Sequence, residues 1–279
     1  MKNLNHLIWI DLNITDLCNL TCSFCPRSDP QIWPNQNIHM PLETIQKVTD
    51  ELIEAKWSGY LSFTGRGEST LHEDFEEVFN ILNRPDRTYR SHMTHNGVQT
   101  KKYWKYLKKL DDCTINTYST IDAFNRNKEL YSLLDNGQKV TMHFKPDGQS
   151  FEDLFTKYRF KPNNRAGLIA SDKNVYDNTP CVHPIKNIFI NFDGSYELCC
   201  NDWNHKTTVD NVNQKNILEI YLTNARLNRT ALKLLTGERS CEKACSECDN
   251  PWYHEHIIED VMNDPESIYN MSMMALQDE

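Results

Sequence analysis

Apolar positions along the first 170 residues follow two alternating patterns. Short apolar runs rich in β-branched and aromatic residues predict strands, and longer segments with an apolar residue at every third or fourth position predict helices. The strand LIWIDLNI (7–14) precedes a helix over 42–57, and one face of that helix carries Leu42, Ile45, Val48, Leu52 and Ile53. Further strands are predicted over 59–65, 87–97, 113–120 and 138–145, with helices over 72–83, 101–110 and 123–136.

This alternation of strands and helices indicates parallel βα units and an α/β fold. Five or six such units suit a partial (β/α)6 barrel of the TIM type or an open sheet. In these folds ligands bind at the carboxyl ends of the strands, where the βα loops gather. The segments rich in cysteine, glycine and polar residues lie at the ends of the predicted strands. These segments are the cysteine loop after 7–14, Gly65–Glu68, His95–Gly97 and Ser119–Asp122.

The pattern changes after about residue 170. The segment KNIFINFDGSYEL (186–198) alternates around Asp193 and Gly194 and predicts a β-hairpin. Two cysteines follow it directly, then a predicted helix over 216–235 and a loop with three more cysteines. We therefore expect a barrel over 1–170, a small cysteine-rich module over 171–260, and a tail over 261–279 that either docks as a helix or frays.

Composition and charge narrow the possible partners. The chain has 279 residues, 39% hydrophobic and 25% charged, which is typical of globular proteins that build their own core. A formal net charge of −9 argues against a nucleic-acid-binding surface. The N-terminal residues do not resemble a signal peptide, and no run of about eighteen apolar residues follows. We expect a cytoplasmic protein without a membrane or nucleic-acid partner.

The ten cysteines form two groups, which implies two sites. A disulfide scaffold is disfavoured because the chain is long and has no signal peptide, so metal ligands are the better interpretation. Cys113 lies apart from both groups and is expected to be a buried core residue.

The first group places Cys18, Cys22 and Cys25 within eight residues, and the nearest histidine, His39, lies fourteen residues further on. A structural zinc site prefers four nearby ligands, and iron–sulfur clusters are normally held by four thiolates. Three thiolates leave one iron with an open position. An open iron is where a substrate or cofactor can coordinate.

The motif Cys18-x3-Cys22-x2-Cys25, with Phe24 directly before the last cysteine, resembles the signature of the radical SAM superfamily. The resemblance implies that the three cysteines hold a four-iron, four-sulfur cluster whose fourth iron is chelated by S-adenosylmethionine (SAM). It also implies that one electron from this cluster cleaves SAM to a 5′-deoxyadenosyl radical. Phe24 is counted among the cofactor-binding residues.

The same resemblance implies SAM contacts at the next strand ends. Gly65-x-Gly67-Glu68 matches the family's Gly-Gly-Glu-Pro loop, which receives the methionine amino group, although Ser69 replaces the proline. Without the cysteines this short motif would be equally typical of a turn. The remaining predicted SAM contacts are Asn96, Ser119, Asp122 and Arg165. Asp122 would serve equally well as a helix cap, and Arg165 as a surface residue.

The second cysteine group resembles the auxiliary-cluster domains called SPASM and twitch. The resemblance implies one auxiliary 4Fe-4S cluster, held by Cys181, Cys199, Cys245 and Cys248, with Cys241 as the rival ligand. Cys200 is expected to point away from Cys199, because successive side chains of a strand alternate. A structural zinc ion on the same cysteines is the main alternative.

The resemblance implies an enzyme that abstracts a substrate hydrogen and completes a two-electron oxidation, with the auxiliary cluster as electron acceptor. The substrate is a small molecule or a peptide, and a flavodoxin- or ferredoxin-like protein supplies electrons. The first predicted strand begins near the N-terminus, so we expect no leader-binding domain, which favours the small-molecule dehydrogenase type. Asp202 and His183 are the expected proton acceptors, although structural roles suit both.

Two alternatives remain open at this point. The first is radical SAM modification of a peptide, by epimerisation or by forming a thioether or crosslink. The second is a non-catalytic protein that binds clusters or zinc and interacts with a partner.

Overall fold

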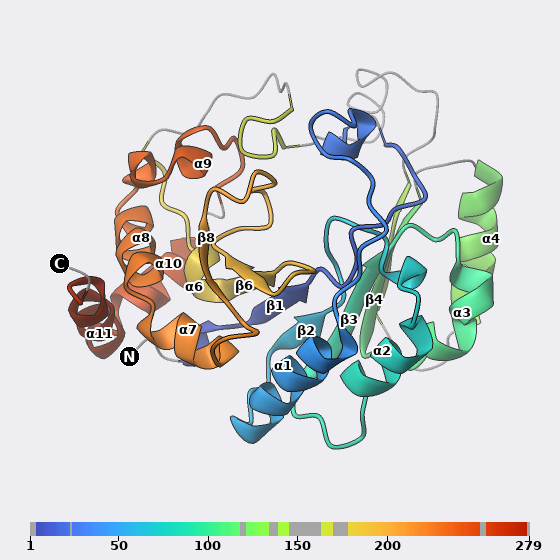
Figure 1. The fold of residues 1–279 in the computed structure, drawn as a ribbon, viewed down its shortest axis with the longest axis horizontal. Coiled ribbons are helices and arrows are strands. Elements are labelled where there is room, and N and C mark those ends of the chain that lie inside the picture. The colour runs from blue at the N-terminus through green and yellow to red at the C-terminus, as the bar shows by residue number, and fades with distance from the viewer. Residues whose placement is uncertain are drawn as a thin grey trace.

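The computed structural model describes residues 4–22, 24–117, 121–133, 139–144, 163–169, 178–251 and 255–277. At its centre lies one eight-stranded sheet with the strand order β5-β4-β3-β2-β1-β6-β7-β8 (Figure 1). The strands are β1 (Trp9–Leu12), β2 (Tyr60–Ser62), β3 (Arg90–His95), β4 (Asp112–Thr117), β5 (Lys139–Phe144), β6 (Asn187–Ile190), β7 (Ser195–Glu197) and β8 (Thr208–Asn211). The strands β5, β4, β3, β2, β1 and β6 pair in parallel with their neighbours in this order. Strand β7 pairs antiparallel with β6 on one side and with β8 on the other. The predicted α/β class with a parallel-dominated sheet is confirmed.

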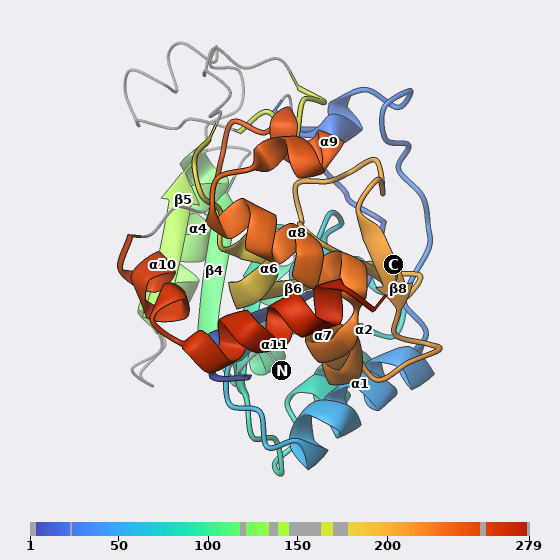
Figure 2. The ribbon, with the colours of Figure 1, turned by 90° about the vertical axis from the view of Figure 1, so that its left-hand side faces the viewer.

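The helices form two groups around this sheet. Helices α1 to α4 flank the parallel strands, while α6 to α11 gather beside β6 to β8, where α11 packs against α8 (Figure 2). The longer helices are α1 (Leu42–Glu54), α2 (Phe75–Leu82), α3 (Thr100–Leu107), α4 (Ile121–Ser132), α7 (Ile217–Thr223), α8 (Ala225–Leu235), α10 (Glu255–Met262) and α11 (Pro265–Ala275). The short ones are α6 (His183–Lys186), α9 (Lys243–Ser246) and the 3-10 turns η1 (Leu4–His6), η2 (Pro26–Ser28), η3 (Ser69–Leu71) and η4 (Arg239–Cys241).

Strand β6 is buried along its whole length, whereas alternate residues of β1 are only half-buried. Ile10 of β1 is fully buried and lies in register with Leu61 of β2 and Ile188 of β6. A parallel strand that is buried on both sides has no solvent-facing positions, which explains the nearly continuous apolar run of β6. Cys113 of β4 is also fully buried in this core, as the sequence predicted.

The predicted hairpin forms, but its first strand belongs to the main sheet. Strands β6 and β7 pair antiparallel around Gly194, whose φ of +83° provides the left-handed turn. Strand β6 also pairs in parallel with β1, so it is the sixth parallel strand of the barrel sheet. From the sequence, this segment is predicted to belong to the second module. Its pairing with β1 leaves no signal in the neighbouring sequence, so the sequence alone does not reveal it.

The predicted single helix over 216–235 is wrong, because two helices, α7 and α8, occupy this range. The break lies at Asn224, which has an extended backbone and accepts a hydrogen bond from the backbone N–H of Leu227 at 2.9 Å. Asparagine favours this N-cap role over a helix interior. Apolar spacing continues across the break and therefore concealed it.

The C-terminal residues that the structure describes are ordered as helices. A second, smaller apolar core joins α6, α8, α10 and α11 through Val182, Ile185, Ala231, Leu235, Val261 and Met271. The described part of the tail therefore docks as a helix. Within the described ranges, no helix combines the length and the apolar character needed to cross a membrane.

Candidate functional site

The loop that carries the first three cysteines is held from both sides. Asn35 accepts a hydrogen bond from the backbone N–H of Cys18 and donates one to its carbonyl, each at 2.9 Å. Beneath the loop, the buried Arg27 forms an ion pair with the buried Asp16, and Trp33 Nε1 donates to the same carboxylate at 2.9 Å. These contacts fix the loop before any ligand binds.

The glycine loop packs directly against the cysteine loop. A Cβ atom on Gly67 would lie 2.1 Å from the carbonyl oxygen of Thr15, and one on Gly65 would lie 2.0 Å from Asn13 Oδ1. Asn13 Oδ1 also accepts a hydrogen bond from the backbone N–H of Arg66 at 2.8 Å. The sequence resemblance assigns these glycines to the loop that receives the methionine amino group of SAM. The structure adds that they let two protein segments touch.

A cavity of about 280 Å³ opens at the carboxyl ends of the parallel strands. It brings together most of the residues that the sequence singled out for the first cluster and for SAM. From those predictions it is lined by Cys18, Cys22, Phe24, Cys25, Gly65, Gly67, Glu68, Asn96 and Arg165, and it is also lined by Asp11 and Cys200. We call it the SAM cavity below.

Protein groups already contact the two polar residues at the floor of this cavity. Glu68 is buried and accepts hydrogen bonds from Thr70 Oγ1, from the backbone N–H of Thr70 at 3.2 Å, and from that of Asn96 at 2.8 Å. Burial raises the pKa of Glu68, while these bonds oppose the rise. Asn96 Nδ2 donates to Asn19 Oδ1 at 2.7 Å. Ammonium recognition by Glu68 remains a prediction.

The other predicted SAM contacts have different placements. Ser119 lies outside the described residues. Asp122 is exposed in the first turn of α4, one residue inside the helix, and is not among the residues that line the SAM cavity. Arg165 lines the SAM cavity, has a left-handed backbone with φ of +49°, and donates from Nη1 to Asn201 Oδ1 at 3.1 Å. A non-glycine residue in this conformation is a local strain of the kind that clusters at functional sites.

A buried ion network joins the glycine loop to the turn that carries Cys199 and Cys200. Arg66 forms an ion pair with the fully buried Glu197 of β7, and it donates to the backbone carbonyl of Asp202 at 2.6 Å. Its guanidinium also lies 5.3 Å from the ring centroid of Trp33 and 5.5 Å from that of Trp203. This arginine therefore fixes the position of the glycine loop relative to the second cysteine group.

The second cysteine group surrounds a separate cavity. Its lining includes Cys181, Cys199, Cys245 and Cys248, whereas Cys241 is not among the lining residues. Burial raises the pKa of the Cys245 thiol, and the neighbouring Cys181, Cys241 and Cys248 raise it further. We call this space the auxiliary cavity. The four residues lie together as predicted, and ligation by them remains a prediction.

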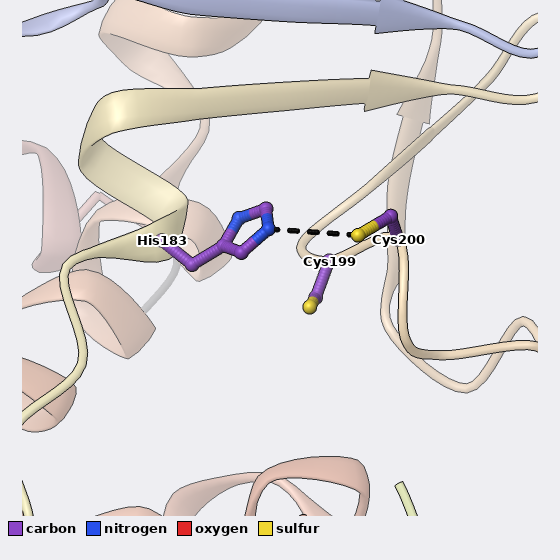
Figure 3. A group of neighbouring side chains, drawn as sticks. All are labelled: His183, Cys199 and Cys200. Carbon is purple, nitrogen blue, oxygen red and sulfur yellow. Dashed lines mark hydrogen bonds between the residues drawn. The ribbon is translucent and has the colours of Figure 1, made fainter. Parts of the chain in front are cut away.

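Cys199 and Cys200 are adjacent in sequence but line different cavities. Cys199 lines the auxiliary cavity and Cys200 lines the SAM cavity. The Cys200 sulfur lies 3.7 Å from Nε2 of His183, as the dashed line in Figure 3 shows. Ligand atoms of His183, Cys199 and Cys200 lie within 4.8 Å of one another. The turn between the two thiols is thus the wall that the cavities share.

The two predicted proton acceptors line the auxiliary cavity. Asp202 is buried, and its Oδ2 accepts hydrogen bonds from the backbone N–H and the hydroxyl of Thr207 at 2.6 and 2.8 Å. Burial alone would lower the pKa of the His183 imidazole, but the hydrogen bond with Cys200 raises it. The contacts of Asp202 match its structural alternative, in which the carboxylate holds a turn.

Asp11 is the acidic residue of the SAM cavity that the sequence analysis passed over. It lies on β1 between Ser62 of β2 and Phe189 of β6, and Trp9 Nε1 donates to its Oδ1 at 2.8 Å. Burial, followed by the neighbouring Cys200, raises its pKa to about 7. An acidic residue within the apolar run LIWIDLNI was the signal that could have identified it.

Two protein-family models match the chain. Residues 12–143 match the radical SAM superfamily, and residues 181–249 match the iron–sulfur cluster-binding domain SPASM. The first match contains the cysteine loop and the glycine loop, and the second contains Cys181 to Cys248.

Curated relatives match over a limited part of their length. The GTP 3′,8-cyclase of Aquifex aeolicus (strain VF5) is 31% identical over 114 residues, which are 39% of this chain and 34% of the relative. The GTP 3′,8-cyclase of Mannheimia succiniciproducens is 25% identical over 125 residues, 45% of this chain and 36% of that protein. The chain thus spans about a third of the length of these relatives.

Solved structures match over most of the chain. BtrN in complex with AdoMet and 2-DOIA has a TM-score of 0.72 at 20% identity and covers 90% of this chain and 95% of its own. The structure anSMEcpe with bound AdoMet has a TM-score of 0.56 at 13% identity, covering 96% and 98%. Streptococcus suis SuiB bound to precursor peptide SuiA has a TM-score of 0.54 at 12% identity, covering 77% and 64%. At these identities the likeness shows the shared fold.

Proposed function

Because this chain combines a radical SAM domain with a SPASM iron–sulfur cluster-binding domain, we propose that it is an oxidoreductase that removes two electrons from a C–H bond of its substrate. A radical SAM domain uses SAM and a 4Fe-4S cluster, and a SPASM domain carries an auxiliary iron–sulfur cluster. When bound, these groups supply a 5′-deoxyadenosyl radical that takes a substrate hydrogen, and an acceptor for the second electron. A flavodoxin- or ferredoxin-like protein is the proposed reductant.

The residues present fit these groups. The first cavity is lined by Cys18, Cys22 and Cys25 of the cysteine loop, a donor set that leaves one iron open for SAM, and also by Cys200 from the second group. The auxiliary cavity has four, which suits a fully ligated cluster without a substrate position. Burial raises the pKa of Cys18 and of Cys245, so these thiols need a metal to hold them as thiolates.

One observation carries the proposal of an oxidation. Cys199 lines the auxiliary cavity and Cys200 lines the SAM cavity, and their sulfurs lie within 4.8 Å of each other, so a substrate beside Cys200 lies one residue away from a proposed ligand of the second cluster. An electron leaving the substrate would cross only this wall. The ion pair between Arg66 and Glu197 holds the wall in place against the glycine loop.

A small molecule is the favoured substrate class. BtrN, whose structure contains AdoMet and 2-DOIA, supports this class, while SuiB bound to a precursor peptide supports the peptide alternative. His183 and Asp202 remain the proposed proton acceptors at the auxiliary side of the wall.

The proposal is tested with Cys245→Ala. The parent protein, reconstituted without oxygen, should hold about eight irons per chain, and this variant about four. With dithionite and a substrate the variant should release 5′-deoxyadenosine yet form little oxidised product. Cys241→Ala is the matched control from the same segment and should keep both clusters. Full product formation by Cys245→Ala would contradict an electron-accepting role, and zinc in the second site would contradict the cluster itself.

The Cys200 thiol favours a second candidate, peptide modification by epimerisation. A thiol that lines the SAM cavity can return a hydrogen atom to a substrate radical, so that the substrate undergoes no net oxidation, and one electron from the proposed reductant with one proton restores the thiol from its thiyl radical. Reaction in deuterated water distinguishes the two functions. An epimerase would place deuterium at the reacting carbon and lose product with Cys200→Ala, whereas an oxidase would form its product without deuterium at that carbon.

A further inference from the structure

Asp11 is a carboxylate of the SAM cavity for which the described residues provide no lysine or arginine partner. It projects from the central strand β1 and accepts a hydrogen bond from the neutral indole of Trp9 at 2.8 Å. Among the described residues it forms no ion pair with a lysine or arginine. The two other carboxylates of this region differ, because Glu68 is bound by three protein donors and Glu197 pairs with Arg66.

Among the residues that the structure describes, neither arginine of the cavity lining forms an ion pair with Asp11. Arg66 is bound to Glu197 and to a backbone carbonyl, and Arg165 donates to Asn201, while its buried Nε has no hydrogen-bond partner. His183 is oriented toward Cys200, and its effect on Asp11 is smaller than that of burial or of Cys200. A carboxylate at this position is therefore left to a ligand.

Ionised Asp11 is costly without such a ligand. Burial raises its pKa to about 7, and Cys200 adds to the rise, while Trp9 and Ser62 oppose it. An uncharged side chain of the same shape would avoid this cost. A carboxylate that remains desolvated beside a reaction cavity is a common sign of a recognition or catalytic role.

We propose that Asp11 binds a protonated amine of the substrate, which makes the substrate a small, amine-bearing polar molecule. This inference rests on the proposed function for the presence of a substrate in the SAM cavity. An ammonium group supplies the charge that Asp11 lacks, and a charge-assisted hydrogen bond in a desolvated site is stronger than a neutral one. An alcohol in the same position would leave the carboxylate charge uncompensated.

The experiment compares matched pairs of probes that differ in one amine. Glucosamine and glucose form one pair, cyclohexylamine and cyclohexanol a second, and lysine amide and norleucine amide a third. Binding to the reconstituted protein loaded with SAM is measured by calorimetry without oxygen. In at least one pair the amine should bind about tenfold or more tightly than its neutral counterpart.

Asp11→Asn should abolish this amine preference, because the amide keeps the shape and the acceptor for Trp9 but removes the charge. Asp112→Asn, which changes another strand carboxylate outside the cavity lining, is the matched control and should retain the preference. The proposal is overturned if no pair shows the preference, or if Asp11→Asn retains it. Formation of 5′-deoxyadenosine by the parent protein is measured separately, and its absence would contradict the proposed function instead.

Discussion

Asp11→Asn should stabilise the protein in the absence of substrate, and increasingly so as the pH rises. The carboxyl group has a pKa of about 7 in the folded chain against an ordinary value of 3.8. Between these values the folded state holds a proton that the unfolded chain has released. Folding stability of the parent protein therefore falls as the pH rises through this interval and levels off above about pH 7. The Asn variant has no such proton and does not lose this stability.

The size of the effect follows from the same two values. A difference of roughly three pKa units corresponds to about 4 kcal/mol over the whole interval, at 1.36 kcal/mol per unit. Iron–sulfur proteins are handled over a narrower pH range. Between about pH 5.5 and about pH 8, the free energy of unfolding of the Asn variant should rise by about 2 kcal/mol relative to that of the parent protein. For a chain of this size that gain corresponds to roughly 4 to 8 °C in the unfolding midpoint.

The assay is differential scanning fluorimetry of both reconstituted proteins without oxygen or SAM, in matched buffers across that pH range. The difference between the two midpoints is the measured quantity, so pH effects common to both proteins cancel. A difference that stays constant with pH would show that Asp11 does not titrate near neutrality. A variant that is less stable at pH 8 would show that the carboxylate has a stabilising partner, and the recognition argument would lose its basis.

Three further predictions follow from other contacts. Arg66→Met should lower the free energy of unfolding by about 3 to 5 kcal/mol, because it leaves Glu197 buried without its main partner. The double variant Arg66→Met with Glu197→Gln should recover part of this loss. An equal loss in the single and the double variant would refute the explanation. Gly67→Ala should reduce the iron content of the first cluster and weaken SAM binding, since its Cβ would lie 2.1 Å from the Thr15 carbonyl oxygen; unchanged iron and SAM affinity would contradict this packing. Asn224→Ala should cost about 1 kcal/mol in chemical denaturation through loss of the α8 cap, and a neutral result would show that tertiary packing alone defines the break.

Local patterns predicted most of the individual elements and motifs. The spacing of Cys18, Cys22 and Cys25 and the turn at Gly194 are properties of a few neighbouring residues, so the sequence displays them directly. The break at Asn224 was missed although it is local, because apolar periodicity continues through it and one capping residue is a weak signal.

The sequence by itself determined the chemistry that is available: two groups of thiols, a glycine loop, parallel strands and a hairpin. These features depend on residue type and on spacing along the chain. Only the tertiary structure decided which groups meet, because those contacts join residues far apart in sequence. Asn13 Nδ2 reaches Asn191 Oδ1 at 2.6 Å across 178 positions, and the pairing of β1 with β6 beside it sets Asp11 next to Phe189. Cys200 lines one cavity and Cys199 the other, and the fold also brings both sulfurs within 4.8 Å of a ring nitrogen of His183, a contact that no local pattern specifies.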